Sequence, residues 1–229
     1  LTRAPKVEIE MLHLQQTLLT TLDCERLSGL VQRCGSLKHL ELDLCDLEEP
    51  QILVESIGNA IHLQDLLLTR GYSDANASTR LSQDAHDMVM RLLHNPQNRL
   101  QKLSLLGLGL ADHHLMSIVD RLPTSRIEVF DIANNDIEAQ GILAFAAQLA
   151  NIKSLKELVL ASNPWDSSAT ATAQYDECIA ALLQGFKAND SIECLSMSRL
   201  DKELEYCTHV NWLRHRILKI PSAIPVGLW

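Results

Sequence analysis

Residues 127–165 read IEVFDIANNDIEAQGILAFAAQLANIKSLKELVLASNPW. The beginning and the end of this stretch carry one pattern twice: apolar residues at offsets 0, 3 and 5, asparagine at offset 8, and a large apolar residue at offset 10. The two copies begin at Ile127 and Leu155, 28 residues apart. Alternation of apolar residues is typical of a short β-strand, whereas apolar residues three and four apart, as between the copies, indicate an amphipathic helix. The stretch therefore predicts a strand–helix unit that is repeated along the chain.

The same pattern recurs before and after this stretch. Cys45, Asn135 and Asn163 occupy offset 8, where the side chain can hydrogen-bond the backbone as it leaves the strand. The last register is the weakest, because Leu200 and Lys202 fall at its final two offsets. The predicted repeats begin at Ile9, Leu37, Leu63, Leu100, Ile127, Leu155 and Ile192.

The pattern L-x-x-L-x-L-x-x-N/C-x-L is that of the leucine-rich repeat. With its period of about 28 residues, the chain resembles the ribonuclease-inhibitor-like class, which includes ribonuclease inhibitor and the sensor halves of NOD-like receptors. The resemblance covers Ile9 to about Leu200. It implies an α/β solenoid shaped like a horseshoe, with about seven repeats, parallel strands on the concave face and helices on the convex face.

The predicted domain organisation is a repeat array over residues 1–200 and a C-terminal cap over residues 201–229. Lys202 to Leu218 is expected to form a helix with Leu204, Val210, Leu213, Ile217 and Leu218 as candidate buried positions. Such a helix can close the open end of a repeat array. The uncharged tail, residues 220–229, contains two prolines and is expected to pack on the cap or on a partner.

Composition excludes some classes of function. A net charge of −9 disfavours binding to a nucleic-acid backbone. A membrane span is not predicted, because the sequence contains no run of about 18 apolar residues. The six cysteines show neither zinc-site nor disulfide-scaffold spacing, so they are interpreted as reduced thiols. The expected location is therefore intracellular, most simply cytoplasmic, in agreement with the class that the repeats resemble.

Two intervals between repeats are nine residues longer than 28. The extra residues, Ser73 to Arg80 and Asp166 to Ala173, are small and polar and are expected to form loops at one rim of the array. Insertions on one face of a repeat array often mark a binding face. The alternative is that they are tolerated extra length, because a longer surface loop costs little free energy.

Side chains between the strand leucines should face solvent and are the candidate binding residues. They form an acidic N-terminal group and an apolar group drawn from four adjacent repeats, and apolar side chains on a solvent face suggest an interface. Scattered surface aliphatics are nevertheless normal. With Asp131 and the repeat-closing Trp165, the predicted partner-binding set is Glu41, Asp43, Asp65, Leu67, Leu106, Val129, Asp131, Val159 and Trp165.

No residues predict catalysis, a metal site or a cofactor. Cys207, His209 and His215 could approach a zinc ion, but their spacing matches no standard site. The sequence therefore favours a non-enzymatic protein–protein interaction module with a protein partner. The alternatives are a structural subunit of a larger assembly, or the sensor or substrate-receptor part of a longer signalling or ubiquitin-ligase chain, which the start at Leu1 allows.

Overall fold

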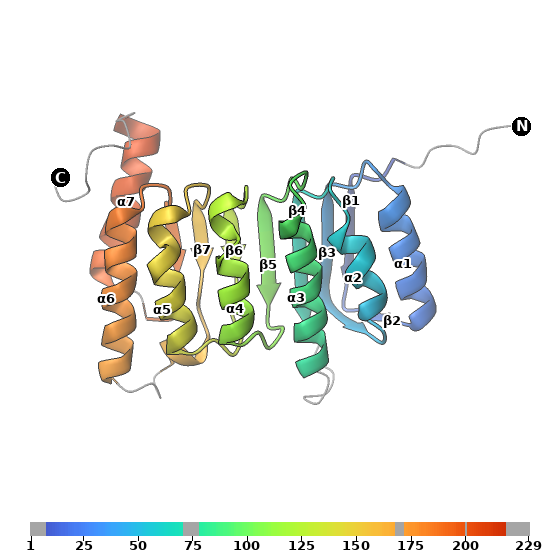
Figure 1. Cartoon of the computed structure of the whole chain (residues 1–229), viewed down its shortest axis with the longest axis horizontal. Helices are drawn as coiled ribbons and strands as arrows, with labels where there is room; N and C mark the ends of the chain where they lie inside the picture. The colour runs from blue at the N-terminus through green and yellow to red at the C-terminus, as the bar shows by residue number, and fades with distance from the viewer. Residues whose placement is uncertain (1–7, 71–77, 168–171, 200, 219–229) are drawn as a thin grey trace, which may run out of the picture. The chain divides into compact units, whose positions relative to one another are not determined.

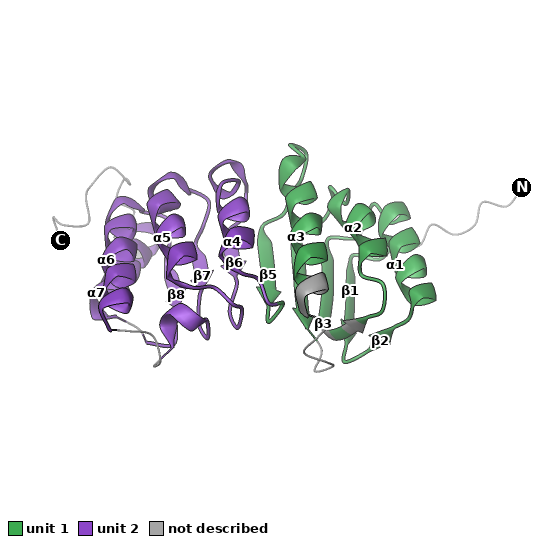
Figure 2. Cartoon of the chain, turned by 60° about the horizontal axis from the view of Figure 1, so that its bottom comes forward, with its two compact units in different colours: residues 1–108 green, residues 109–229 purple. Residues whose placement is uncertain are grey.

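The computed structural model describes residues 8–70, 78–167, 172–199 and 201–218. The chain divides into two compact units, residues 1–108 (unit 1) and 109–229 (unit 2), which are coloured separately in Figure 2. Both units consist of parallel strands that alternate with helices, so the α/β class predicted from the sequence is confirmed.

In unit 1, four strands form a parallel sheet in the order β1-β3-β4-β5, and the short β2 (Leu18–Leu19) also pairs with β3. The helices of unit 1 pack side by side, α1 on α2 and α2 on α3, and cover one face of the sheet (Figure 1). The four strands are β1 (Met11–Gln15), β3 (His39–Leu47), β4 (Asp65–Arg70) and β5 (Lys102–Leu106). The three helices are α1 (Thr21–Arg33), α2 (Gln51–Gly58) and α3 (Ser78–His94).

In unit 2, three short strands are paired in parallel, and each helix packs against the next. The strands are β6 (Val129–Asp131), β7 (Glu157–Val159) and β8 (Cys194–Ser196). The α-helices are α4 (Asp112–Val119), α5 (Ala139–Gln148), α6 (Thr172–Ala188) and α7 (Lys202–Leu213). The 3-10 helices are η2 (Leu122–Thr124), η3 (Leu149–Asn151) and η4 (Pro164–Asp166), and a π-helix, η5 (Arg214–Leu218), follows α7.

The strand register follows the sequence repeat. Each of the seven main strands begins two residues after a predicted repeat start, as Met11 follows Ile9 and Val129 follows Ile127. In unit 1, Leu40 of β3 is paired with Leu66 of β4, and both side chains are almost completely buried. The repeat leucines and isoleucines therefore stack in layers between the sheet and the helices, and this stacking is the core.

Asparagine side chains close the strand ends in unit 2, as predicted. The Asn163 carboxamide oxygen accepts the backbone N–H groups of Asn135 and Ile137, both at 3.2 Å. Its amide nitrogen donates to the carbonyls of Ile132 at 3.0 Å and Leu160 at 2.9 Å. Each buried asparagine thus satisfies backbone groups of its own repeat and of the preceding one, and so joins neighbouring repeats.

Two further buried asparagines, Asn189 just after α6 and Asn211 within α7, also hydrogen-bond the backbone, and the sequence analysis missed them. Asn189 donates to the carbonyls of Leu149 at 2.8 Å and Ile152 at 2.7 Å. Asn211, on α7, donates in turn to the carbonyl of Ile192 at 2.9 Å. The terminal helix is therefore hydrogen-bonded to the repeat before it.

Asp112, the first residue of α4, does not cap that helix; its carboxylate accepts the backbone N–H of Glu138 at 2.7 Å and so caps α5 in the next repeat. The structure also corrects one predicted helix. The predicted helix 202–218 is α-helical only to Leu213 and then continues as a π-helix. The tail at 220–229 lies outside the described residues.

The two predicted loop insertions are partly helical. α3 begins at Ser78 and α6 at Thr172, so the last residues of both insertions belong to helices, each 17 residues long. The second insertion begins with Asp166, which belongs to η4. The remaining parts, at 73–77 and 168–171, lie outside the described residues. Within the part of the chain that the structure describes, no helix is long and apolar enough to cross a lipid bilayer.

Candidate protein-binding surface

The strand side chains that alternate with the core leucines lie on the sheet face opposite the helices. In unit 1 we define the unit 1 face as the side chains of His13, Glu41, Asp43, Asp65, Leu67 and Leu106. Backbone pairing places His13 beside Glu41, Glu41 beside Leu67, and Thr69 beside Leu106. These residues share one surface, because a strand alternates its side chains between two faces.

The acidic end of the unit 1 face is held by hydrogen bonds rather than by bonds to lysine or arginine. His39 Nδ1 lies 2.7 Å from an Asp65 carboxylate oxygen. Gln15 and Thr69 donate to the two carboxylate oxygens of Asp43, at 2.9 and 2.7 Å. Among the described residues, Glu41, Asp43 and Asp65 form no ion pair with lysine or arginine. Their negative charge is therefore available to a cationic partner.

The apolar candidates are accessible on both units. Leu67 and Leu106 in unit 1, and Val129 and Val159 in unit 2, are each partly exposed. In unit 2, Asp131 lies two residues after Val129 and therefore on the same face of β6. Its carboxylate accepts the backbone N–H of Ala133 at 3.0 Å. The apolar side chains can therefore contact a partner without the backbone being rearranged.

Trp165 does not fit the predicted role in partner binding. Its indole is only 1% exposed and stacks on Tyr175, with ring centroids 6.1 Å apart and an interplanar angle of 11°. A partner could contact it only after the repeat opened. We therefore assign Trp165 to the core of unit 2 and omit it from the surface.

Unit 2 contains a polar hollow that the sequence analysis did not identify. It has a volume of about 590 Å³ and is open to solvent, and it lies where β6, β7 and β8 end. Buried Asp166 forms one wall, and its carboxylate accepts the backbone N–H groups of Ser198 and Arg199. The Arg199 guanidinium lies 3.8 Å from the centroid of the Tyr175 ring. The only sequence signal was that Asp166 begins one of the two insertions.

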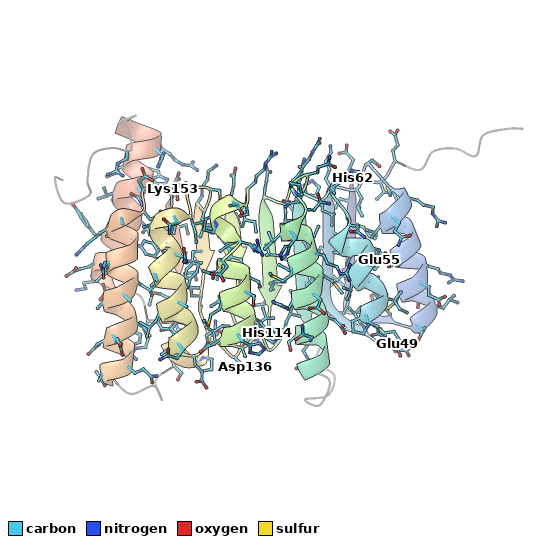
Figure 3. The ribbon with its side chains drawn as sticks, in the orientation of Figure 1. Glu49, Glu55, His62, His114, Asp136 and Lys153 are labelled. Atoms are coloured by element: carbon cyan, nitrogen blue, oxygen red, sulfur yellow. The ribbon has the colours of Figure 1, made fainter. Side chains whose placement is uncertain are left out.

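Polar side chains also mark the two edges of unit 2. His114 and Asp136 lie at the edge where the strands end, whereas Lys153 lies at the opposite edge (Figure 3). Nδ1 of buried His114 accepts the backbone N–H of Ala111 at 3.1 Å and so caps the start of α4. The role of this histidine is therefore structural.

The six thiols differ in their surroundings, and the hydrogen bond with Ser36 lowers the pKa of the Cys34 thiol. Cys24, Cys34, Cys45, Cys178 and Cys207 are buried, and none of the six cysteines is in a disulfide. Burial raises the pKa of the Cys178 thiol to about 11, and burial also raises the pKa of the exposed Cys194 thiol. A raised pKa disfavours the thiolate, which is the nucleophilic form.

The strand register, the buried asparagines and the layered leucines define a leucine-rich repeat fold of the ribonuclease-inhibitor-like class. No protein-family model matches the chain. The ribonuclease inhibitor of Mus musculus is 28% identical over 165 residues, which cover 69% of this chain and 34% of that relative. The chain thus spans about a third of the length of the curated relative that it matches.

Two solved structures share the fold. Leiomodin-1 actin-binding site 2 has a TM-score of 0.58 at 16% identity, over 75% of this chain and 92% of that one. The tropomodulin C-terminal domain of Caenorhabditis elegans has a TM-score of 0.56 at 13% identity, over 72% of this chain and 97% of that one. At these identities the likeness shows the fold alone.

Proposed function

We propose that this chain is a non-enzymatic protein–protein interaction module and that the unit 1 face is its main binding surface. The observation that carries the proposal is that partly exposed Leu67 and Leu106 share a face with carboxylates that, among the described residues, form no ion pair with lysine or arginine. The fitting partner presents an apolar anchor surrounded by lysine or arginine. The names of the similar proteins support the general role, because they include an inhibitor of a protein and an actin-binding site.

The physical basis is a rigid surface that loses little conformational entropy when a partner binds. The backbone of the unit 1 face is fixed by the paired strands, so a partner binds without paying to order a loop. Apolar anchors supply most of the affinity of an interface, whereas surrounding charges mainly raise the association rate and the specificity. The acidic residues of the face therefore act mainly in selecting a basic partner.

The test is the double variant Leu67→Asp, Leu106→Asp, compared by quantitative affinity capture with Met116→Asp. Met116 is 45% exposed on helix α4 and serves as a matched apolar-to-acidic control away from the sheet face. Binding by the double variant should fall about 30-fold or more, because a central anchor contributes about 2 kcal/mol. The control should bind like the wild type. A partner captured equally by all three proteins would remove the unit 1 face from consideration.

A further variant separates the two sheet faces. Val129→Asp, Val159→Asp changes the corresponding side chains of unit 2. If only this second double variant loses the partner, binding uses the face of unit 2 instead. Thermal unfolding of each variant controls for loss of fold.

A second candidate function is a subunit held permanently in a larger assembly. Met11, Leu18 and Leu22, on the first repeat, are 64%, 59% and 51% exposed, which favours coverage by another protein. The candidate predicts that the isolated chain self-associates. A monomer at high concentration in analytical ultracentrifugation would argue against it. We also propose, as a further alternative, that the chain is the sensor or substrate-receptor part of a longer chain. A cytoplasmic location is likewise a proposal, and the free thiols fit it.

A further inference from the structure

Three side chains with metal-binding atoms converge on the unit 1 face. His13 comes from β1, whereas Glu41 and Asp43 come from β3, two residues apart and therefore on the same side of the strand. Strand pairing sets His13 opposite Glu41 and Gln15 opposite Asp43. One ligand atom from each of the three side chains lies within 4.8 Å of the other two. His13 Nε2 lies 3.6 Å from an oxygen of Glu41.

Neighbouring polar side chains orient Asp43 but leave the negative charge of the two carboxylates in place. Gln15 and Thr69 hydrogen-bond one carboxylate oxygen each on Asp43, which fixes its orientation while each oxygen keeps a free lone pair. The other nearby histidine, His39, is bound to Asp65. Glu41 and Asp43 are therefore two close carboxylates that share only one imidazole, and two like charges at this separation repel each other.

We propose that His13, Glu41 and Asp43 bind a divalent transition metal ion, with zinc as the ion that fits best. Imidazole and carboxylate ligands suit zinc, and three protein ligands with one open position are common in zinc sites that retain a water. Zinc–ligand bonds of about 2.1 Å in a tetrahedron place neighbouring ligand atoms about 3.4 Å apart. The 3.6 Å between His13 and Glu41 is close to this value, and all three ligand atoms lie within 4.8 Å of one another, so only a small movement of the side chains remains.

The chemistry of the ligands also excludes a calcium-type site. Calcium takes six to eight oxygen ligands, whereas this cluster offers one nitrogen and two carboxylates. The fourth zinc position faces solvent, because the His13 and Glu41 side chains are 40% and 37% exposed. A water, or a side chain of a bound protein, can occupy it. The proposal concerns the ion alone and does not rest on the proposed function.

This inference revises the expectation of no metal site. His13 and Glu41 are 28 residues apart, and they become neighbours only because β1 and β3 are adjacent and in register. Standard zinc motifs place two ligands within a few residues on one element. Glu41 and Asp43 have that spacing on β3, but a search for local spacing cannot find His13.

The test is zinc titration of the whole chain by isothermal calorimetry, with wild type, His13→Gln and Asp43→Asn. A zinc chloride titration of the wild type should show one saturable site. Loss of a second-shell group costs 10- to 100-fold in metal affinity, so loss of a ligand should weaken binding about 100-fold. Asp65→Asn is the matched control, because it removes the same charge from the same face outside the cluster. It should change the affinity only a few-fold.

A second measurement identifies the ligand atoms. Cobalt(II) bound to the wild type should give visible d–d bands without the thiolate-to-cobalt charge-transfer band that exposed Cys194 would produce. The proposal is overturned if His13→Gln binds zinc like the wild type, if Asp65→Asn weakens binding as much as Asp43→Asn, or if the thiolate band appears. Each substituted side chain is partly exposed, and circular dichroism will show whether each variant is folded.

Discussion

Units 1 and 2 use different side chains to hydrogen-bond the backbone where a strand ends. At the strand ends of unit 2, Asn135 and Asn163 make several amide hydrogen bonds to backbone groups of two repeats. At the same repeat position in unit 1, Cys45 has its sulfur 3.3 Å from the carbonyl of Leu14 and 3.5 Å from that of Asp43. A thiol is a weak donor and an asparagine a strong one. The strand ends of unit 2 are therefore more firmly hydrogen-bonded than those of unit 1.

The exposed sheet faces of the two units also differ, and here unit 1 carries more polar and charged side chains. The unit 1 face carries one histidine, His13, and three carboxylates that no lysine or arginine pairs with among the described residues. In unit 2 the predicted binding residues other than the buried Trp165 are Val129, Asp131 and Val159, and the Asp131 carboxylate accepts a backbone N–H. The repeat thus fixes the backbone positions, while the variable positions between the leucines give each unit a different exposed face.

The largest effect is expected from Asn163→Ala in unit 2. The substitution leaves several buried backbone groups without a partner, at about 1–3 kcal/mol each and not fully additive. We expect a loss of about 4 kcal/mol in the free energy of unfolding, measured by urea denaturation. Asn151→Ala, at an exposed asparagine, is the control and should change stability by less than about 0.5 kcal/mol. Equal losses in both variants would contradict the role given to Asn163.

The helix layers of both units should respond alike to added volume. A Cβ on Gly185 of α6 would lie 2.8 Å from the Ala146 carbonyl, and a Cβ on Gly58 of α2 would lie 2.6 Å from the Arg91 Cβ. Gly185→Ala and Gly58→Ala should each lower the free energy of unfolding by about 2 kcal/mol, because the neighbouring helices must move apart. Thermal unfolding is the measurement.

Gly29→Ala provides the matched control for these helix substitutions. The nearest atom to its added Cβ is the guanidinium end of Arg33, at 3.2 Å, which can rotate away. Alanine is a better helix former than glycine, so this variant should be more stable by about 0.5–1 kcal/mol. Destabilisation of all three variants to the same extent would show that helix packing is not the cause.

A smaller effect is expected from Cys45→Ala in unit 1. The change removes a buried sulfur and its weak hydrogen bonds, and should cost about 1.5 kcal/mol. Native-state hydrogen exchange should show the loss in the amides of β1 and β3. A cost as large as that of Asn163→Ala would contradict the proposed difference between the two units.

The smallest effect concerns the first helix of unit 1. Thr20 and Asp23 form a capping box, and hydrogen bonds from Thr20 lower the pKa of the Asp23 carboxyl. A carboxyl with a lowered pKa stabilises the fold above its unfolded pKa, and this stabilisation is lost as pH falls through the folded pKa. Thr20→Ala should therefore raise the pKa of Asp23 toward its ordinary value, as measured by NMR titration. An unchanged pKa would show that the capping box does not form.

The sequence by itself determined the repeat, because apolar alternation and the asparagine or cysteine position are local patterns that recur at about 28 residues, or at 37 where an insertion lies. It therefore fixed the strands, their order along the chain, and which side chains alternate with the core leucines. Only the tertiary structure decided that Trp165 is buried and that Asp112 caps α5 of the next repeat. It also decided the hollow beside Asp166 and the convergence of His13, Glu41 and Asp43. Each of these depends on distances between residues in different repeats. Such distances are set by helix packing and side-chain conformations, which a local sequence pattern does not encode.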